Sequence, residues 1–177
     1  MKKILSIIAI ALVAVIGYGL LQASKLQEIK VTKTVTINAD AQKVFDMVKY
    51  LGNFPKWSPF LAEDPSQKYE VKGNDGTVGA SYHWVGNGGD DVGFQQIAKI
   101  EEGKQVVMQC DIQKPFEAKP SFSYYFTPTA NGVEVKQDFE LKSSLGNAFF
   151  LWLFGVKEGV EQTNQKGLDL LKKALEK

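Results

Sequence analysis

The chain has 177 residues, the size of one ordinary domain, and is long enough to bury a core without metal or disulfide crosslinks. Lysine and arginine number 21 against 20 aspartate and glutamate residues, and this balance argues against a nucleic-acid partner because no strong positive field attracts phosphates. The single cysteine, Cys110, excludes an intramolecular disulfide, and no His and Cys residues are spaced to hold zinc. We therefore expect one domain without metal or cofactor.

An apolar run occupies Ile4–Leu21 and follows two N-terminal lysines. These 18 residues rise about 27 Å as a helix, close to the hydrocarbon thickness of a bilayer. A cleaved signal peptide is the alternative, but Leu21, Gln22 and Ala23 match a cleavage site poorly. We expect an uncleaved single-pass anchor over residues 1–22 with an exported C-terminal domain, although three lysines beyond the run oppose this orientation.

A linker is expected over residues 23–29, followed by a domain of residues 30–177. Val31–Ile37 alternates β-branched residues with threonines, the period-two pattern of a half-buried strand. Apolar residues between positions 41 and 48 recur at helical spacing. The proline-containing segment Leu51–Trp57 predicts a second short helix or turn.

Six more strands are predicted downstream, because Gly- and Asn-rich turns separate most of the β-type segments. They cover Lys68–Lys72, Val78–Val85, Asp91–Ile100, Gln105–Ile112, Ser121–Pro128 and Val133–Leu141. Short turns imply antiparallel neighbours. The last segment, Ser144–Lys177, is predicted to be one long helix that covers the apolar face of the sheet. The fold class is therefore α+β.

The segment TVTINADAQKVFDMVKYLGNFPKWSPF resembles the opening of START-like, helix-grip proteins, the SRPBCC superfamily of polyketide cyclases/dehydrases and lipid-transport proteins. The segments DPSQKYEVKG, VGASYHWVGN and DVGFQQIAKIEEGKQVVMQ resemble a bacterial subgroup with an N-terminal hydrophobic helix, so the likeness covers roughly residues 4–177. The resemblance implies a seven-stranded antiparallel sheet wrapped around a long C-terminal helix. It also implies a cavity for lipids, sterols, polyketides or other apolar ligands, but it specifies no reaction.

Aromatic side chains give an apolar ligand contact area at small entropic cost. We expect Phe54 and Phe60 at the mouth of the pocket, with packing of the second helix against the sheet as the alternative. Trp57 is interpreted as a packing residue. Tyr82 and Trp84 share one face of a strand and are candidate ligand contacts, and core packing is the alternative for Trp84.

The C-terminal helix begins with an aromatic cluster at residues 149–154, which is apolar nearly all round. Three interpretations are open. The cluster, with Phe150 and Phe154 as candidate contacts, lines the cavity and its portal; it dips into a nearby membrane surface; or it forms a broad core.

Polar residues on apolar strand faces are candidates to orient a ligand. Gln96 falls on the same face as Phe94, and Gln137 lies in an apolar series on the last strand. A backbone hydrogen bond at a bulge or edge is the alternative for both glutamines. Met108 and Cys110 share another inward face, where we assign the cysteine no chemistry.

No catalytic constellation is spaced in the sequence, and the single histidine, His83, is expected to point away from Tyr82 and Trp84. We therefore expect a membrane-tethered binding or carrier module for an apolar small molecule or lipid, and leave the oligomeric state open. A cyclase/dehydratase-type enzyme, using Tyr124 or Tyr125 with the two glutamines, is the first alternative. A structural or stress-response protein with a filled core is the second.

Overall fold

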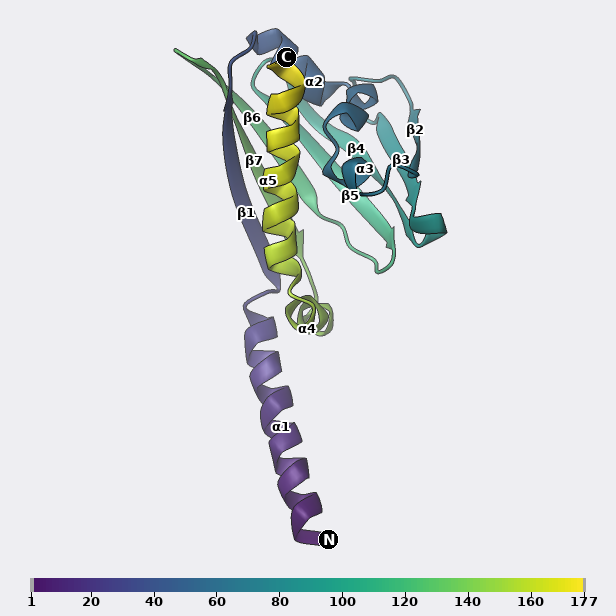
Figure 1. Cartoon of the computed structure of the whole chain (residues 1–177), viewed down its shortest axis with the longest axis vertical. Helices are drawn as coiled ribbons and strands as arrows, with labels where there is room; N and C mark the ends of the chain where they lie inside the picture. Colours follow the sequence, from purple (N-terminus) through teal and green to yellow (C-terminus); the bar gives the residue numbers. More distant parts are fainter. Residues whose placement is uncertain (1, 177) are drawn as a thin grey trace.

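The computed structural model of the chain describes residues 2–176; Met1 and Lys177, the outer ends of the expected anchor and domain, lie outside the described residues. Helix α1 (Lys2–Ser24) projects away from the rest of the molecule (Figure 1). Its stretch Ser6–Ser24 is long and apolar enough to cross a membrane. The connection to the first strand is shorter than the expected linker of residues 23–29, because α1 continues to Ser24 and the strand begins at Glu28.

Seven strands form one antiparallel sheet, as predicted, and their order in it is β1-β7-β6-β5-β4-β3-β2. Their bounds lie within three residues of the predicted ones: β1 Glu28–Ile37, β2 Lys68–Lys72, β3 Ser81–Gly86, β4 Asp91–Glu101, β5 Gln105–Lys114, β6 Ser121–Thr129 and β7 Gly132–Lys142. The first and last strands pair along their whole length, with Val31 opposite Phe139. This pairing closes one side of the sheet around the C-terminal helix (Figure 1).

Three short helices follow β1. Helix α2 (Ala41–Lys49) begins where the Asp40 carboxylate accepts a hydrogen bond from the backbone N–H of Lys43 at 3.1 Å, and it buries one apolar face. The predicted second helix is the 3-10 helix η1 (Leu51–Lys56), and a one-turn helix α3 (Pro59–Glu63) comes after it. A further 3-10 turn, η2 (Asn87–Gly89), joins β3 to β4.

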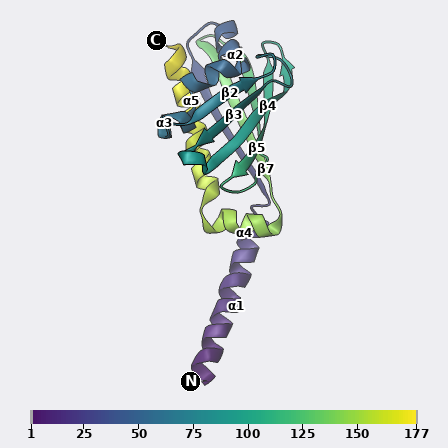
Figure 2. The ribbon, with the colours of Figure 1, turned by 90° about the vertical axis from the view of Figure 1, so that its right-hand side faces the viewer.

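The prediction of one continuous C-terminal helix is wrong. The segment forms α4 (Leu145–Leu153) and α5 (Val156–Leu175), separated at Gly155. Gly155 has a φ of 61°, in the left-handed region that glycine adopts without a steric penalty. Because of this break, α4 runs crosswise at the end of α1 while α5 lies along the sheet (Figure 2).

The core is divided into two clusters. The larger one joins α2, η1 and the C-terminal half of α5 to the sheet, and Phe45, Leu168 and Leu171 are fully buried in it. The smaller one lies near α1 and includes Ile29, Phe139, Leu141 and Leu151. The gap between the clusters contains the candidate site, since residues of both clusters line it.

Candidate ligand-binding cavity

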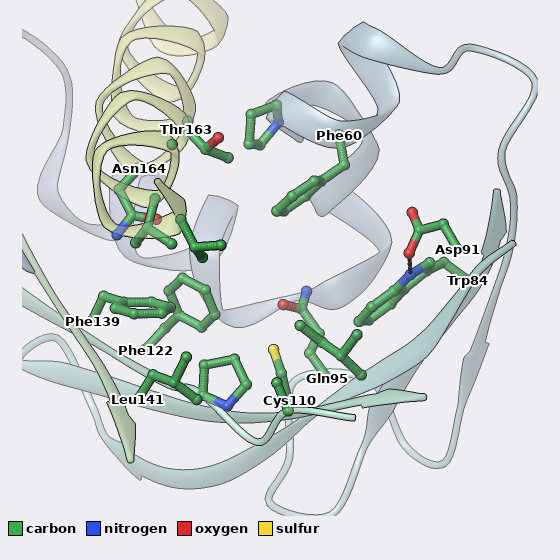
Figure 3. A pocket seen from close by; sticks show the side chains of 18 of the residues that line it. Phe60, Trp84, Asp91, Gln95, Cys110, Phe122, Phe139, Leu141, Thr163 and Asn164 are labelled. Carbon is green, nitrogen blue, oxygen red and sulfur yellow. Dashed lines mark hydrogen bonds between the residues drawn. The ribbon is translucent and has the colours of Figure 1, made fainter. Parts of the chain in front are cut away.

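A cavity of about 440 Å³ lies between the sheet and α5. This volume falls within the range of about 300–1,000 Å³ that is usual for small-molecule sites. Strands β3 to β7, helices η1 and α3, and the N-terminal half of α5 supply the wall. The lining is mainly apolar and aromatic, as Figure 3 shows for Phe60, Phe122 and Phe139. The space suits an apolar molecule.

Six of the ten predicted contact residues line this cavity: Phe54, Phe60, Tyr82, Trp84, Gln137 and Phe154. The Met108 side chain is fully buried within the core instead. The Phe150 side chain is 58% exposed on the outside of α4. Trp57, interpreted as a packing residue, both packs on Phe54 and borders the cavity.

The predicted inward face of β4 is wrong, so Phe94 and Gln96 are not cavity residues. Phe94 stacks on His83 on the outer face of the sheet, with ring centroids 5.1 Å apart. Gln96 is exposed, and its Nε2 donates to the carbonyl oxygen of Gly79 at 3.0 Å. Gly93, Gln95 and Ile97 face inward on β4. The register then shifts between Ile97 and Lys99, so that Ile100 also faces inward although it lies three residues after Ile97. Strict alternation counted back from Ile100 therefore assigns Phe94 and Gln96 to the inner face, whereas both lie on the outer face.

Trp84 is held in the wall by two neighbours. It faces Gly93 across the β3–β4 pair, where a Cβ atom would lie 2.6 Å from the indole ring. The indole Nε1 donates to the Asp91 carboxylate at 2.9 Å (Figure 3). Asp91 is the only carboxylate among the described residues that line the cavity, and no pattern in the sequence indicated it.

Four buried side-chain polar atoms have no hydrogen-bond partner within residues 2–176, and each belongs to a residue that lines the cavity: Tyr82 Oη, Gln95 Nε2, Gln137 Oε1 and Asn164 Nδ2. Leaving such an atom unpaired costs about 1–3 kcal/mol. The amide of Gln137 is oriented by its Nε2, which donates to the Tyr124 hydroxyl at 2.9 Å. Figure 3 shows the Gln95 amide reaching into the cavity from β4. The wall thus offers amide donors, one carbonyl acceptor and one hydroxyl.

The titratable hydroxyl and thiol groups of the wall are held in their neutral forms. Burial raises the pKa of the Cys110 thiol to about 12, with Asp111 adding to the shift. Burial also raises the pKa values of Tyr82 and Tyr124 above the ordinary phenol value. These groups therefore carry a proton that a ligand can accept at neutral pH. His83 faces away from the cavity, as predicted, and burial lowers its pKa.

The raised pKa of Cys110 predicts a measurable loss of stability in alkali. The ordinary value is about 9 and the folded value about 12, so this contribution is complete below pH 9 and is lost as the pH rises towards 12. Linkage gives a loss of about 2 kcal/mol at about pH 10.5. The free energy of unfolding, measured with urea in micelles, should fall between pH 7 and about pH 10.5 by about 2 kcal/mol less for Cys110→Ala than for the unchanged chain. An equal loss of stability in the two proteins would contradict the raised pKa of the Cys110 thiol.

Residues 28–176 match the family described as "Polyketide cyclase / dehydrase and lipid transport". The chain belongs to this family. The resemblance to this family is thus confirmed over residues 28–176, and the helix-grip architecture is that of the polyketide cyclase/dehydrase and lipid transport family. Among curated proteins, none is similar enough to the chain to count as a relative.

Solved structures share the fold of this family member at low sequence identity. Protein CV1439 from Chromobacterium violaceum is 12% identical with a TM-score of 0.59, and the match covers 84% of this chain and 99% of that one. The Aha1 dimer from Colwellia psychrerythraea is 16% identical with a TM-score of 0.59, covering 84% and 96%. The di-domain ARO/CYC StfQ from the steffimycin biosynthetic pathway is 10% identical with a TM-score of 0.62, covering 84% and 51%. At these identities the likeness concerns the fold alone.

Proposed function

We propose that this family member binds an apolar small molecule or lipid that carries a few polar groups, and that α1 tethers it to a membrane with the domain on the exported side. The main support is the set of four unpartnered polar atoms around a mainly apolar cavity. A ligand with complementary donors and acceptors would pair them, and the apolar wall would supply most of the contact area. The contacts we propose are Phe54, Phe60, Tyr82, Trp84, Gln95, Gln137, Phe154 and Asn164.

The tether rests on α1. Its stretch Ser6–Ser24 is exposed along most of its length, whereas the core helix of a soluble protein would be mostly buried. The lysines at the N-terminus favour the inside of the cell for that end and export of the domain.

A cyclase or dehydratase activity is the second candidate. One similar structure, StfQ, is named as a di-domain ARO/CYC protein. Buried phenols such as Tyr82 and Tyr124, kept protonated by their raised pKa values, are suited to donate hydrogen bonds to a substrate carbonyl. The filled-core alternative does not agree with a cavity of about 440 Å³.

Native mass spectrometry of the full chain, released from lipid nanodiscs, tests the binding proposal. We expect one small apolar molecule per chain, recoverable by solvent extraction, or uptake of one added 11-(dansylamino)undecanoic acid. A chain that is empty and takes up no probe would overturn the proposal. Conversion of the extracted molecule on incubation with fresh protein would favour the enzyme.

A further inference from the structure

Helix α4 exposes an unusual amount of apolar surface for a helix at the end of a domain. It contains no charged residue, and only Ala148 and Leu151 are buried. Leu153 is 55% exposed, and Phe154 at its C-terminal end is 74% exposed. Neighbouring apolar residues exposed in this way mark a surface that is covered by a partner or a membrane.

The position of α4 along α1 indicates which of these covers it. The rings of Tyr18 and Trp152 lie 6.2 Å apart, edge to face. At Gly19 a Cβ atom would come within 2.5 Å of the Phe149 ring, so the ring packs directly on the α1 backbone there. Gly19 precedes the end of the apolar stretch at Ser24 by five residues, or about 7.5 Å of helix. Helix α4 therefore lies beside the last turns of the apolar stretch, at the depth of about 5–10 Å that interfacial helices reach.

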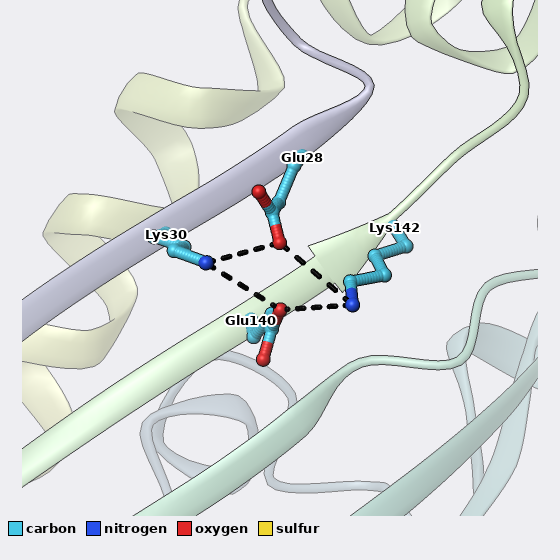
Figure 4. Close-up of polar contacts among 4 residues, drawn as sticks. All are labelled: Glu28, Lys30, Glu140 and Lys142. Atoms are coloured by element: carbon cyan, nitrogen blue, oxygen red, sulfur yellow. Dashed lines mark ion pairs between the residues drawn. The ribbon is translucent and has the colours of Figure 1, made fainter.

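Charged residues mark the other side of this boundary. Glu28, Lys30, Glu140 and Lys142 form a cluster of ion pairs at the start of β1 and the end of β7, with N–O distances from 3.0 to 3.8 Å (Figure 4). All four side chains are exposed. The polarity of the surface thus changes between α4 and the first residues of the sheet, as it does where a bilayer meets water.

The cavity extends to this same end of the domain. Phe154 and Val156 line it from the junction of α4 and α5, and Phe116 lines it from the loop between β5 and β6. The first residue after that loop, Ser121, pairs with Glu140 of the charged cluster. Both Phe116 and Phe154 are more than half exposed. Two exposed aromatic rings therefore border the cavity next to α4.

We propose that α4 lies in the membrane interface and that the cavity opens beside it, between Phe116 and Phe154, so that an apolar ligand passes directly between bilayer and cavity. The seating of α4 rests on its contacts with α1 and on the proposed tether, whereas the passage of ligand rests on the proposed binding function. The partner surface is the lipid bilayer that holds α1.

Spin labels on the full chain in phosphatidylcholine nanodiscs test the seating of α4. In a Cys110→Ala background, single cysteines are placed by Phe150→Cys or, as the control, by Lys173→Cys on the exposed surface near the end of α5. We expect the label at position 150 to be relaxed at least threefold more strongly by oxygen than by a water-soluble nickel chelate, and the label at 173 to show the reverse. Equal access of the chelate to both labels would overturn the proposal.

The portal is tested by the rate at which the full chain takes up 11-(dansylamino)undecanoic acid from vesicles. Phe154→Asp should slow uptake at least fivefold, because a charge would then lie in the opening. The control Val78→Asp changes an exposed apolar residue in the loop between β2 and β3 and should leave the rate unchanged. Equal rates for both variants would overturn the portal. If the unchanged chain takes up no probe while the label at position 150 lies in lipid, the binding function is overturned and the seating of α4 still stands.

Discussion

Replacing Thr163 with phenylalanine is expected to weaken binding of 11-(dansylamino)undecanoic acid at least tenfold. Thr163 lies on α5 and lines the cavity opposite the sheet (Figure 3). A benzyl group in its place takes up a large share of the space available to the ligand. The helix itself should persist, because phenylalanine and threonine have similar helix propensities. Titration of dansyl emission in nanodiscs, corrected with empty nanodiscs, measures the change.

The neighbouring residue provides the control for this substitution. Gln162 is exposed and faces the water side of α5, so that Gln162→Phe adds the same ring outside the cavity. Its affinity for the probe should equal that of the unchanged chain. If Thr163→Phe also binds with unchanged affinity, then the ligand does not occupy the space between the sheet and α5.

The second large effect is expected at Gln137. Its Oε1 is buried without a partner, while its Nε2 donates to the Tyr124 hydroxyl. In Gln137→Leu, a polar group of the co-purifying ligand would lose its partner and remain buried, which costs about 1–3 kcal/mol, or roughly five- to 150-fold in affinity. The free energy of unfolding without ligand should fall by only about 1 kcal/mol, because one hydrogen bond is lost while the Tyr124 hydroxyl replaces the removed Oε1 as the unpaired buried atom. Displacement of the extracted ligand and urea unfolding measure the two quantities.

Gln109 supplies the matched control. It lies on the outer, exposed face of β5, so Gln109→Leu removes the same amide away from the cavity. It should leave ligand affinity unchanged. A Gln137→Leu chain that retained full affinity but lost several kcal/mol of stability would show that Gln137 serves the core alone.

The strands were predictable because turn residues and alternation determine where they begin and end, whereas the direction of single side chains depends on irregularities. The bulge after Ile97 reversed the predicted face of β4 and hid Gln95. The pairing of β3 with β4 identifies the inner face of β4, because Gly93 lies opposite Trp84 and leaves space for the indole ring on that face. The break at Gly155 was missed because isolated glycines are tolerated within helices.

Asn164 was missed although the sequence holds a signal for it. It lies between Val160 and Leu168 at helical spacing, so it interrupts an apolar stripe that faces the sheet. A polar residue within such a stripe is a candidate for a buried, ligand-facing group. Asp91 offered no comparable signal, because its role depends on the tertiary contact between its carboxylate and Trp84.

The connection between α1 and β1 limits how far the domain can travel. Residues 25–27 are all that separate the helix from the strand, and three extended residues span at most about 10 Å. With α1 in a bilayer, the domain therefore stays at that surface and cannot swing across to a facing membrane. The proposed ligand would then exchange with the lipids around α1, and transport over a longer distance would require a second, diffusing acceptor.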